Sequence, residues 1–252
     1  MENASEGSLL RPLWRRMLGQ PAWVLCLAFY GVLGALRVVG TLGQSSGRLA
    51  LIAGFMIMWC LPFLVYSRTG RQRSGLTKID RPVWLVVGPT LGVLSAWVIH
   101  IIGFGLFGTS PDNWYVTVRT SYQADPRLLE LPLLVQFLVF TAPAVIFSPL
   151  GEEFFFRGML QVSLSERFGM RIATTGTALA FGLVHLLHHG VAVGESGLRL
   201  FPISGLLWVA LMAGVSLLFA LVRAKSGSIW PAVASHVAFN IGMNVAIFYL
   251  LP

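Results

Sequence analysis

The chain has 252 residues, of which 56% are hydrophobic and 11% charged, and its mean hydropathy is +0.75. A water-soluble domain of this length has too little interior to bury so much apolar surface, which excludes soluble folds. The net charge of +8 does not indicate nucleic-acid binding, because the basic residues lie between long apolar stretches. We therefore expect an integral membrane protein whose partner is the lipid bilayer and not a nucleic acid.

Long apolar stretches recur along the whole chain, without the alternating ten-residue segments of a transmembrane β-barrel. We predict seven spans, at residues 22–43, 49–67, 83–107, 131–149, 172–189, 204–222 and 229–250. The predicted fold class is all-α: a polytopic transmembrane bundle of seven or eight helices that forms one integral membrane domain over residues 1–252.

The amino-terminal segment, residues 1–21, is basic and contains "LLRPLWRRMLGQ". This stretch is short and amphipathic, which favours a helix lying on an anionic membrane surface, with a basic tail as the alternative. The segment 108–130 is the longest polar stretch between spans. We interpret it as a connector whose Trp114, Tyr115 and Tyr122 rest at the level of the lipid headgroups.

The basic residues predict the orientation of the chain in the membrane. Thirteen fall on the side of the amino terminus: Arg11, Arg15, Arg16, Arg68, Arg71, Arg73, Lys78, Arg81, Arg157, Arg167, Arg171, Arg223 and Lys225. Four fall on the other side: Arg48, Arg119, Arg127 and Arg199. Arg37 lies within the first span. This asymmetry predicts a cytoplasmic amino terminus in the cell (inner) membrane.

The first group of unexpected polar residues is "EEFFFRG", residues 152–158. An ionised side chain at the centre of a membrane helix costs about 2.5–3.5 kcal/mol on insertion scales, so such groups mark functional sites by default. Glu153 and Arg157 are four residues apart and can pair on one helix face. Glu152 points about 100° away and has no such partner in the sequence, so we predict a desolvated carboxylate that can act as a base. The alternative is a salt-bridged cytoplasmic loop.

The second group is "FGLVHLLHHG", residues 181–190. Phe181 and His185 are four residues apart, so the phenyl ring can pack against the imidazole. His185 and His189 have the same spacing, which two metal ligands on one helix can use. We interpret His188 and His189 as polar residues at the membrane interface. For His185 the alternative is a hydrogen-bonded core histidine.

The third group, "HVAFN", places His236 and Asn240 on one face of the last span, where an interhelical hydrogen-bonding pair is the alternative. Together the three groups supply a carboxylate, two imidazoles and an amide. Carboxylate and imidazole can bind a metal or activate water, and an amide N–H can stabilise an oxyanion. This inventory indicates a hydrolase.

The order Glu-Glu-x-x-x-Arg, Phe-x-x-x-His and His-x-x-x-Asn on successive membrane helices resembles the CAAX protease and bacteriocin-processing (CPBP, or Abi) family. That family includes the type II CAAX prenyl endopeptidases, and its members often have eight helices. Here the motifs stand as "EEFFFR", "FGLVH" and "HVAFN". The resemblance implies a membrane-embedded endopeptidase with its catalytic core in residues 130–250 and a site that opens to the cytoplasm.

The resemblance also implies roles for individual residues. Glu152 would activate the attacking water, and Glu153 and Arg157 would brace that carboxylate. Asn240 would support the oxyanion.

The two histidines have two possible roles within the same resemblance. His185 and His236 would either position the water or bind a metal together with Glu152. The family is usually labelled metalloprotease, and a Glu–His–His set suits tetrahedral zinc with one open position. A metal-free site with Glu152 as the base fits the same residues.

The predicted span boundaries place Glu152 at the cytoplasmic edge, away from the depth of His185. The polar groups can meet if the fourth helix continues through "FFFRGMLQV", so we predict a long fourth helix that runs past Met159.

The implied substrate is a membrane-anchored peptide or protein, either prenylated or a precursor, and no loop selects between these. Two other functions fit the polar residues: a transporter or proton pathway, because intramembrane acids and histidines also build ion pathways, and a non-catalytic membrane scaffold. A b-type cytochrome with His185 and His236 as axial ligands is a further alternative.

Overall fold

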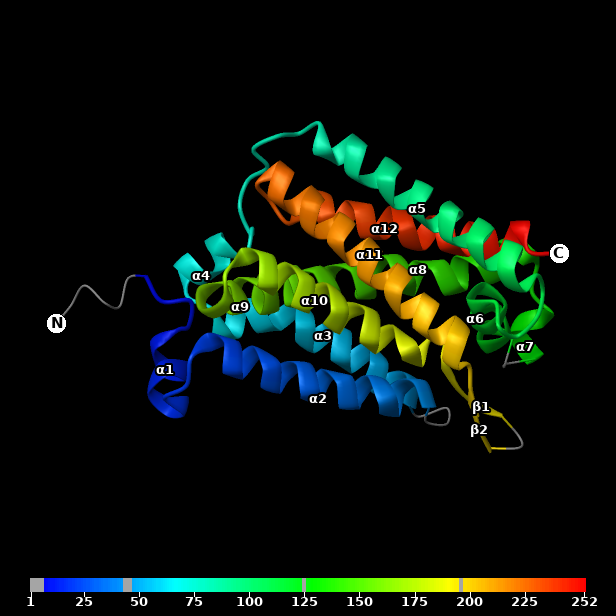
Figure 1. Cartoon of the computed structure of the whole chain (residues 1–252), viewed down its shortest axis with the longest axis horizontal. Helices are drawn as coiled ribbons and strands as arrows, with labels where there is room; N and C mark the ends of the chain where they lie inside the picture. Colours follow the sequence, from blue (N-terminus) through cyan, green and yellow to red (C-terminus); the bar gives the residue numbers. More distant parts are fainter. Residues whose placement is uncertain (1–6, 43–46, 124–125, 195–196) are drawn as a thin grey trace.

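The computed structural model describes residues 7–42, 47–123, 126–194 and 197–252, and it is a bundle of helices that run along one long axis (Figure 1). The first half contains α1 (Pro12–Leu18), α2 (Ala22–Leu42), α3 (Gly47–Val65), α4 (Arg68–Arg73), α5 (Trp84–Phe107), α6 (Trp114–Tyr122) and α7 (Pro126–Leu129). The second half contains α8 (Leu133–Glu152), the π-helical η1 (Glu153–Leu160), α9 (Gln161–Phe168), α10 (Met170–Val184), the 3-10 turn η2 (His185–Leu187), β1 (Val191–Gly194), β2 (Gly197–Leu200), α11 (Pro202–Ser226), α12 (Trp230–Val245) and the π-helical η3 (Ala246–Leu250). The predicted all-α class is confirmed, with one antiparallel hairpin, β1–β2, as its strand content in the described part of the chain.

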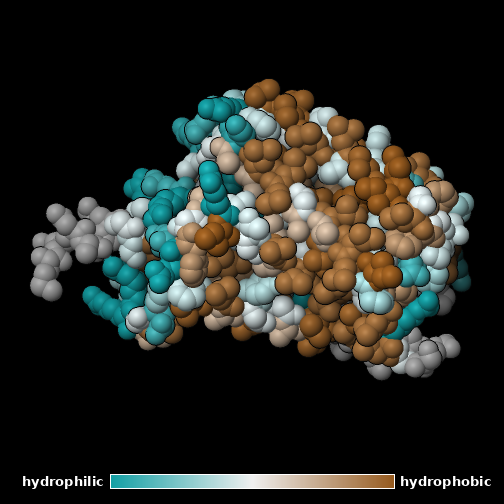
Figure 2. Space-filling model, viewed as in Figure 1, coloured by the Kyte–Doolittle hydropathy of each residue, from teal (hydrophilic) through white to brown (hydrophobic). Residues whose placement is uncertain are grey.

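Each of the seven predicted spans coincides with an apolar helix. Six helices of the described chain are long and apolar enough to cross a membrane: 22–42, 84–107, 133–168, 170–187, 202–226 and 230–250. The seventh, α3, is apolar over the shorter stretch Leu49–Val65. Hydrophobic side chains cover the middle of the molecular face in Figure 2, and hydrophilic ones gather at the end where α1 and α4 lie. The protein is therefore an integral membrane protein.

The predicted amino-terminal helix is present as α1, and the chain beside it is tied to the end of α3. The Arg11 backbone N–H donates to the carbonyl of Val65 at 2.9 Å, and Trp14 Nε1 donates to the carbonyl of Leu64 at 2.9 Å. Residues 1–6 of the predicted interfacial segment lie outside the described residues. Placement of α1 on a membrane surface stays a prediction.

The fourth span is a continuous helix of 36 residues, Leu133–Phe168, as predicted. It passes from α8 through η1 into α9, and it ends where Gly169 adopts a φ of 78°, a conformation that favours glycine. A π-helical segment widens the turn and frequently occurs at functional sites. Here it begins at Glu153, so the two acidic residues lie inside the bundle rather than in a cytoplasmic loop.

The last span, α12, lies between α5 and α8, and its contact with α5 depends on glycine (Figure 1). A Cβ on Gly92 would collide with the backbone oxygen of Ser235, and one on Gly242 would lie 3.1 Å from the Cβ of Ala96. Small residues let membrane helices approach closely. This packing sets the position of His236, which follows Ser235 directly.

The interpretation of residues 108–130 as a connector with aromatic residues at headgroup level is wrong for Trp114 and Tyr115. Trp114 and Tyr115 belong to α6 and are fully buried. The Tyr115 hydroxyl donates to the carbonyl of Ala96 at 2.8 Å, and the Trp114 ring stacks on Trp208 at 5.7 Å. The two side chains therefore anchor α6 to α5 and α11, because buried indole and phenol groups contribute large apolar contacts.

Candidate active site

Two adjacent carboxylates lie at the centre of the bundle, at the junction of α8 and η1. Glu152 and Glu153 are both fully buried, and Arg157 is 1% exposed. Nη1 of Arg157 lies 3.0 Å from Oε1 of Glu153, which is the predicted pair at four-residue spacing. The Arg157 guanidinium also lies 4.4 Å from the ring centre of Phe181, so the cation is held by a carboxylate and an aromatic face together.

His236 of α12 contacts both glutamates. Its Nδ1 lies 2.8 Å from Oε1 of Glu153, and its Nε2 lies 3.7 Å from Oε2 of Glu152. The carboxylate of Glu153 can only accept, so Nδ1 carries the proton in this bond, and in neutral His236 the Nε2 lone pair faces Glu152. The ring stacks on Phe219 at 4.9 Å, which holds it in this orientation. The prediction that the side chains of Glu152 and His236 lie close together is confirmed.

His185 lies at the start of η2, where α10 tightens into a 3-10 turn. Its Nδ1 lies 2.7 Å from the carbonyl of Phe181, so this nitrogen donates and leaves Nε2 as the free acceptor. The predicted packing on Phe181 is confirmed, with ring centres 4.4 Å apart. Trp208 of α11 donates from Nε1 to the His185 carbonyl at 3.0 Å, which anchors the turn.

Asn240 lies one turn after His236 on α12 and is 6% exposed. Its Nδ2 donates one hydrogen bond to the carbonyl of Ala144 on α8, at 2.8 Å. An amide nitrogen carries two protons, so a second donor remains. The bond to α8 orients this amide, as expected for an interhelical pair.

The prediction that Glu152 has no cationic partner is wrong. Nη1 of Arg37, on α2, lies 2.6 Å from Oε1 of Glu152, and both side chains are buried. Nη2 of Arg37 lies 3.1 Å from Nε2 of His188. Neither Arg37 nor His188 is among the residues predicted for the site from the sequence. The available signal was the position of Arg37 as the one charged residue inside an apolar span.

His188 and His189 are not equivalent interfacial residues. His188 contacts Arg37 at the site, whereas His189 points away from it. Nδ1 of His189 lies 3.0 Å from Oγ1 of Thr117, and Nε2 lies 2.9 Å from Oγ of Ser204. The 3-10 turn over residues 185–187 breaks the regular helical spacing, so His185 and His189 do not share a face as two metal ligands would.

The three predicted metal ligands are Glu152, His185 and His236. Within the described residues, no group of three or more His, Cys, Asp or Glu side chains converges as metal ligands do. Oε1 of Glu152 is held by the Arg37 cation, which repels a second cation at the same carboxylate. The residues as arranged do not fit a three-ligand zinc site.

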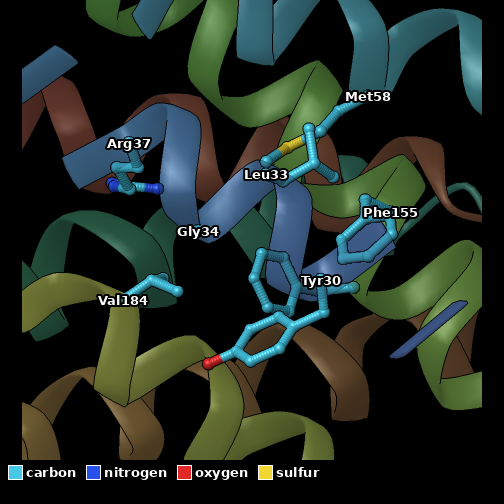
Figure 3. A pocket seen from close by; sticks show the side chains of 8 residues that line it. Tyr30, Leu33, Gly34, Arg37, Met58, Phe155 and Val184 are labelled. Carbon is cyan, nitrogen blue, oxygen red and sulfur yellow. The ribbon is translucent and has the colours of Figure 1, made fainter. Parts of the chain in front are cut away.

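The site is enclosed. Its six predicted residues are each at most 6% exposed. A small pocket beside Arg37 is lined by residues of α2, α3, η1 and α10, including Tyr30, Met58 and Phe155 (Figure 3). It holds about 10 Å³, room for about one water molecule. The six side chains are therefore shielded from bulk solvent.

Residues 134–242 match the family model described as type II CAAX prenyl endopeptidase Rce1-like. No curated protein and no solved structure matches the chain significantly. The matched segment contains all three motifs and all six predicted site residues, which confirms the resemblance noted from the sequence. Arg37 lies outside it.

Proposed function

We propose that this chain, whose residues 134–242 match the family model described as type II CAAX prenyl endopeptidase Rce1-like, hydrolyses peptide bonds at the site of Glu152 and His236. One observation supports this function above the others. Oε2 of Glu152 has no hydrogen-bond partner among the described residues, and it lies 3.7 Å from Nε2 of His236, with both side chains buried. Two acceptors at this separation suit one bridging water.

The proposed first step is the activation of that water. A water between the two atoms donates one O–H to Oε2 of Glu152 and the other to Nε2 of His236. Glu152 takes up the first proton as the water oxygen attacks the carbonyl carbon of the scissile peptide bond. The C=O π electrons move to the oxygen and produce a tetrahedral oxyanion. General-base assistance of this kind contributes about 10²- to 10⁴-fold.

The second step is collapse of the tetrahedral intermediate. The free N–H of Asn240 stabilises the oxyanion in the proposed site. The C–N bond breaks as the oxyanion reforms the carbonyl, and the proton held by Glu152 passes to the leaving amine nitrogen. The products are a carboxylic acid and an amine, and Glu152 returns to its ionised state. His185 offers its Nε2 as a further acceptor that orients the water or the substrate.

The substrate class is proposed from the family and from the surroundings of the site. The buried site lies within a helical bundle whose face in Figure 2 is largely apolar. A membrane-anchored peptide, prenylated or a precursor, can approach such a site from the bilayer. We also propose that the amino terminus faces the cytoplasm in the cell membrane, on the basis of the distribution of Lys and Arg.

The function is tested with the purified full-length protein in detergent and a panel of membrane-anchored peptides, prenylated and unprenylated. Glu152→Gln is expected to lower kcat by about 10²- to 10⁴-fold. Glu166→Gln is the matched control, because Glu166 is a partly exposed residue of the same long helix whose Oε1 pairs with Arg73 at 2.7 Å. Cleavage by Glu152→Gln at the rate of the wild type would overturn the proposal.

The zinc alternative has a separate readout. The wild-type protein is dialysed against a chelator and assayed before and after zinc is returned. The geometry favours full activity in chelator, since the Arg37 cation holds Oε1 of Glu152 and repels a second cation at that carboxylate. Activity that is lost in chelator and restored by zinc would show that the metal-free description of the site is wrong.

A further inference from the structure

Arg37 connects two parts of the site that the three motifs do not connect. Its guanidinium lies between Oε1 of Glu152, 2.6 Å from Nη1, and Nε2 of His188, 3.1 Å from Nη2. The ring of Phe55 on α3 lies 5.7 Å from the guanidinium carbon. Arg37 is 4% exposed, so solvent does not compete for these contacts.

The contact with Glu152 involves one carboxylate oxygen. A guanidinium can bind both oxygens of a carboxylate in a bidentate arrangement, through two parallel N–H donors. Here it holds Oε1 through Nη1, and its other terminal nitrogen is directed to His188. The other oxygen, Oε2 of Glu152, faces His236. The arrangement distinguishes two oxygens that are chemically equivalent in a free carboxylate.

His188 determines which way the guanidinium is turned. Arginine only donates, so Nε2 of His188 accepts this hydrogen bond with its lone pair, and the neutral imidazole carries its proton on Nδ1. The His188 ring also meets the His185 ring edge to face, with centres 5.1 Å apart. With both terminal nitrogens engaged, Arg37 cannot rotate without breaking one of the two contacts.

We propose that Arg37 is a positioning residue for the peptidase reaction, and that His188 sets its orientation. Arg37 holds Glu152 by Oε1, so that Oε2 is the oxygen that receives the proton of the attacking water. This inference rests on the proposed function, and it adds α2 to the helices that build the site. A purely structural cation would neutralise Glu152 equally well from any direction.

The test measures kcat and KM for Arg37→Ala, Arg37→Gln, Arg37→Lys, His188→Ala and His188→Gln in the full-length protein. Misplacing a reacting group by about 1 Å can cost about 10²-fold, so we expect Arg37→Gln to lower kcat by that order with little change in KM. Arg37→Lys keeps the charge but cannot reach Glu152 and His188 with two fixed donors, so an intermediate loss is expected. Arg73→Gln, which removes an exposed partner of Glu166, is the control.

Two rescue experiments separate positioning from folding. His188→Gln supplies an amide oxygen that accepts from Arg37, so it should retain more activity than His188→Ala at an equal thermal midpoint. Added guanidinium, below denaturing concentration, should restore part of the kcat of Arg37→Ala. Wild-type kcat in both Arg37→Gln and His188→Ala would overturn the inference.

The two failures can be told apart. If Glu152→Gln cleaves like the wild type, the proposed function fails, and the positioning role falls with it. If Glu152→Gln is inactive while the folded Arg37 and His188 variants cleave normally, only the positioning role is wrong. Should Arg37→Gln not fold, His188→Ala still decides, because it leaves the ion pair with Glu152 in place.

Discussion

Nδ1 of His236 donates a hydrogen bond to Oε1 of Glu153 over 2.8 Å, and this bond joins α12 to the π-helical segment η1. The bond turns the opposite nitrogen of His236 towards Glu152. The same oxygen of Glu153 lies 3.0 Å from Arg157. The two adjacent glutamates therefore meet at one imidazole, which Glu153 orients and Glu152 faces.

Replacing Glu153 should impair both activity and stability. Glu153→Leu removes the charge that pairs with Arg157 and the acceptor that fixes the His236 tautomer. Loss of an orienting partner typically lowers activity about 10- to 100-fold. Breaking a buried ion pair by removing one partner costs about 3–5 kcal/mol. Peptidase assays and thermal unfolding in detergent would measure the two effects, and a variant with normal kcat would contradict the orienting role.

Two asparagines on one face of α12 allow a matched comparison. Asn240 bonds to the carbonyl of Ala144 and is proposed to bind the oxyanion, whereas Asn244 bonds to Thr141 and Tyr122. Asn240→Ala should lower kcat by about 10²- to 10³-fold, as expected for loss of one oxyanion donor. Asn244→Ala should lower stability by about 1–3 kcal/mol and leave kcat per folded molecule unchanged. Equal kcat in the two variants would remove the special role of Asn240.

The stability of the end of the bundle around β1 and β2 should depend on pH through His189. Burial lowers the pKa of His189 to about 4, although the nearby Asp112 carboxylate acts in the opposite direction. Because an unfolded histidine has a pKa near 6.5, the unfolded state binds the proton first as the pH falls from about 6.5 to about 4. Stability is therefore complete above about pH 6.5 and decreases through this window, by at most about 1.4 kcal/mol per pH unit.

The variant His189→Gln isolates this contribution, because other groups titrate in the same range. The thermal midpoint of the wild type should fall more steeply between pH 6.5 and 4 than that of the variant. Below about pH 4 both states carry the proton, so the two curves should run parallel. Parallel curves over the whole range would show that His189 does not contribute to the pH dependence.

The glycine contact between α5 and α12 should be sensitive to a single methyl group. Gly92→Ala would place a Cβ against the backbone oxygen of Ser235 and push away the helix turn that carries His236. Overpacking of this kind typically costs about 1–3 kcal/mol. Gly214→Ala on α11 is the control, since no neighbouring atom lies within 4 Å of a Cβ there. Equal thermal midpoints for the two variants would argue against close packing at Gly92.

Local spacing was sufficient to predict much of the fold and part of the site. The seven apolar stretches have about the length that a membrane span needs, and each forms a helix. The pairs Glu153–Arg157 and Phe181–His185 are four residues apart, so one helical turn brings their side chains together wherever the helix lies. The requirement that separate motifs meet at one depth predicted the long fourth helix.

Contacts between residues far apart in the chain could not be predicted in this way. Arg37 and Glu152 are separated by 115 residues, and no periodicity relates α2 to α8. The burial of Trp114 and Tyr115 depends in the same way on α5 and α11, which the polar character of residues 108–130 concealed. The different directions of His188 and His189 arise from a 3-10 turn, and single-residue propensities do not specify its position.

The ion pair between Arg37 of α2 and Glu152 of α8 makes the segment matched by the family model, residues 134–242, dependent on a residue outside it. A fragment containing residues 134–242 alone would carry a buried anion without its countercharge. Exchange of amino-terminal helices with a homologous protein would succeed only if the incoming helix brought an arginine to the same depth. The structural unit at this site is thus larger than the segment that sequence similarity detects.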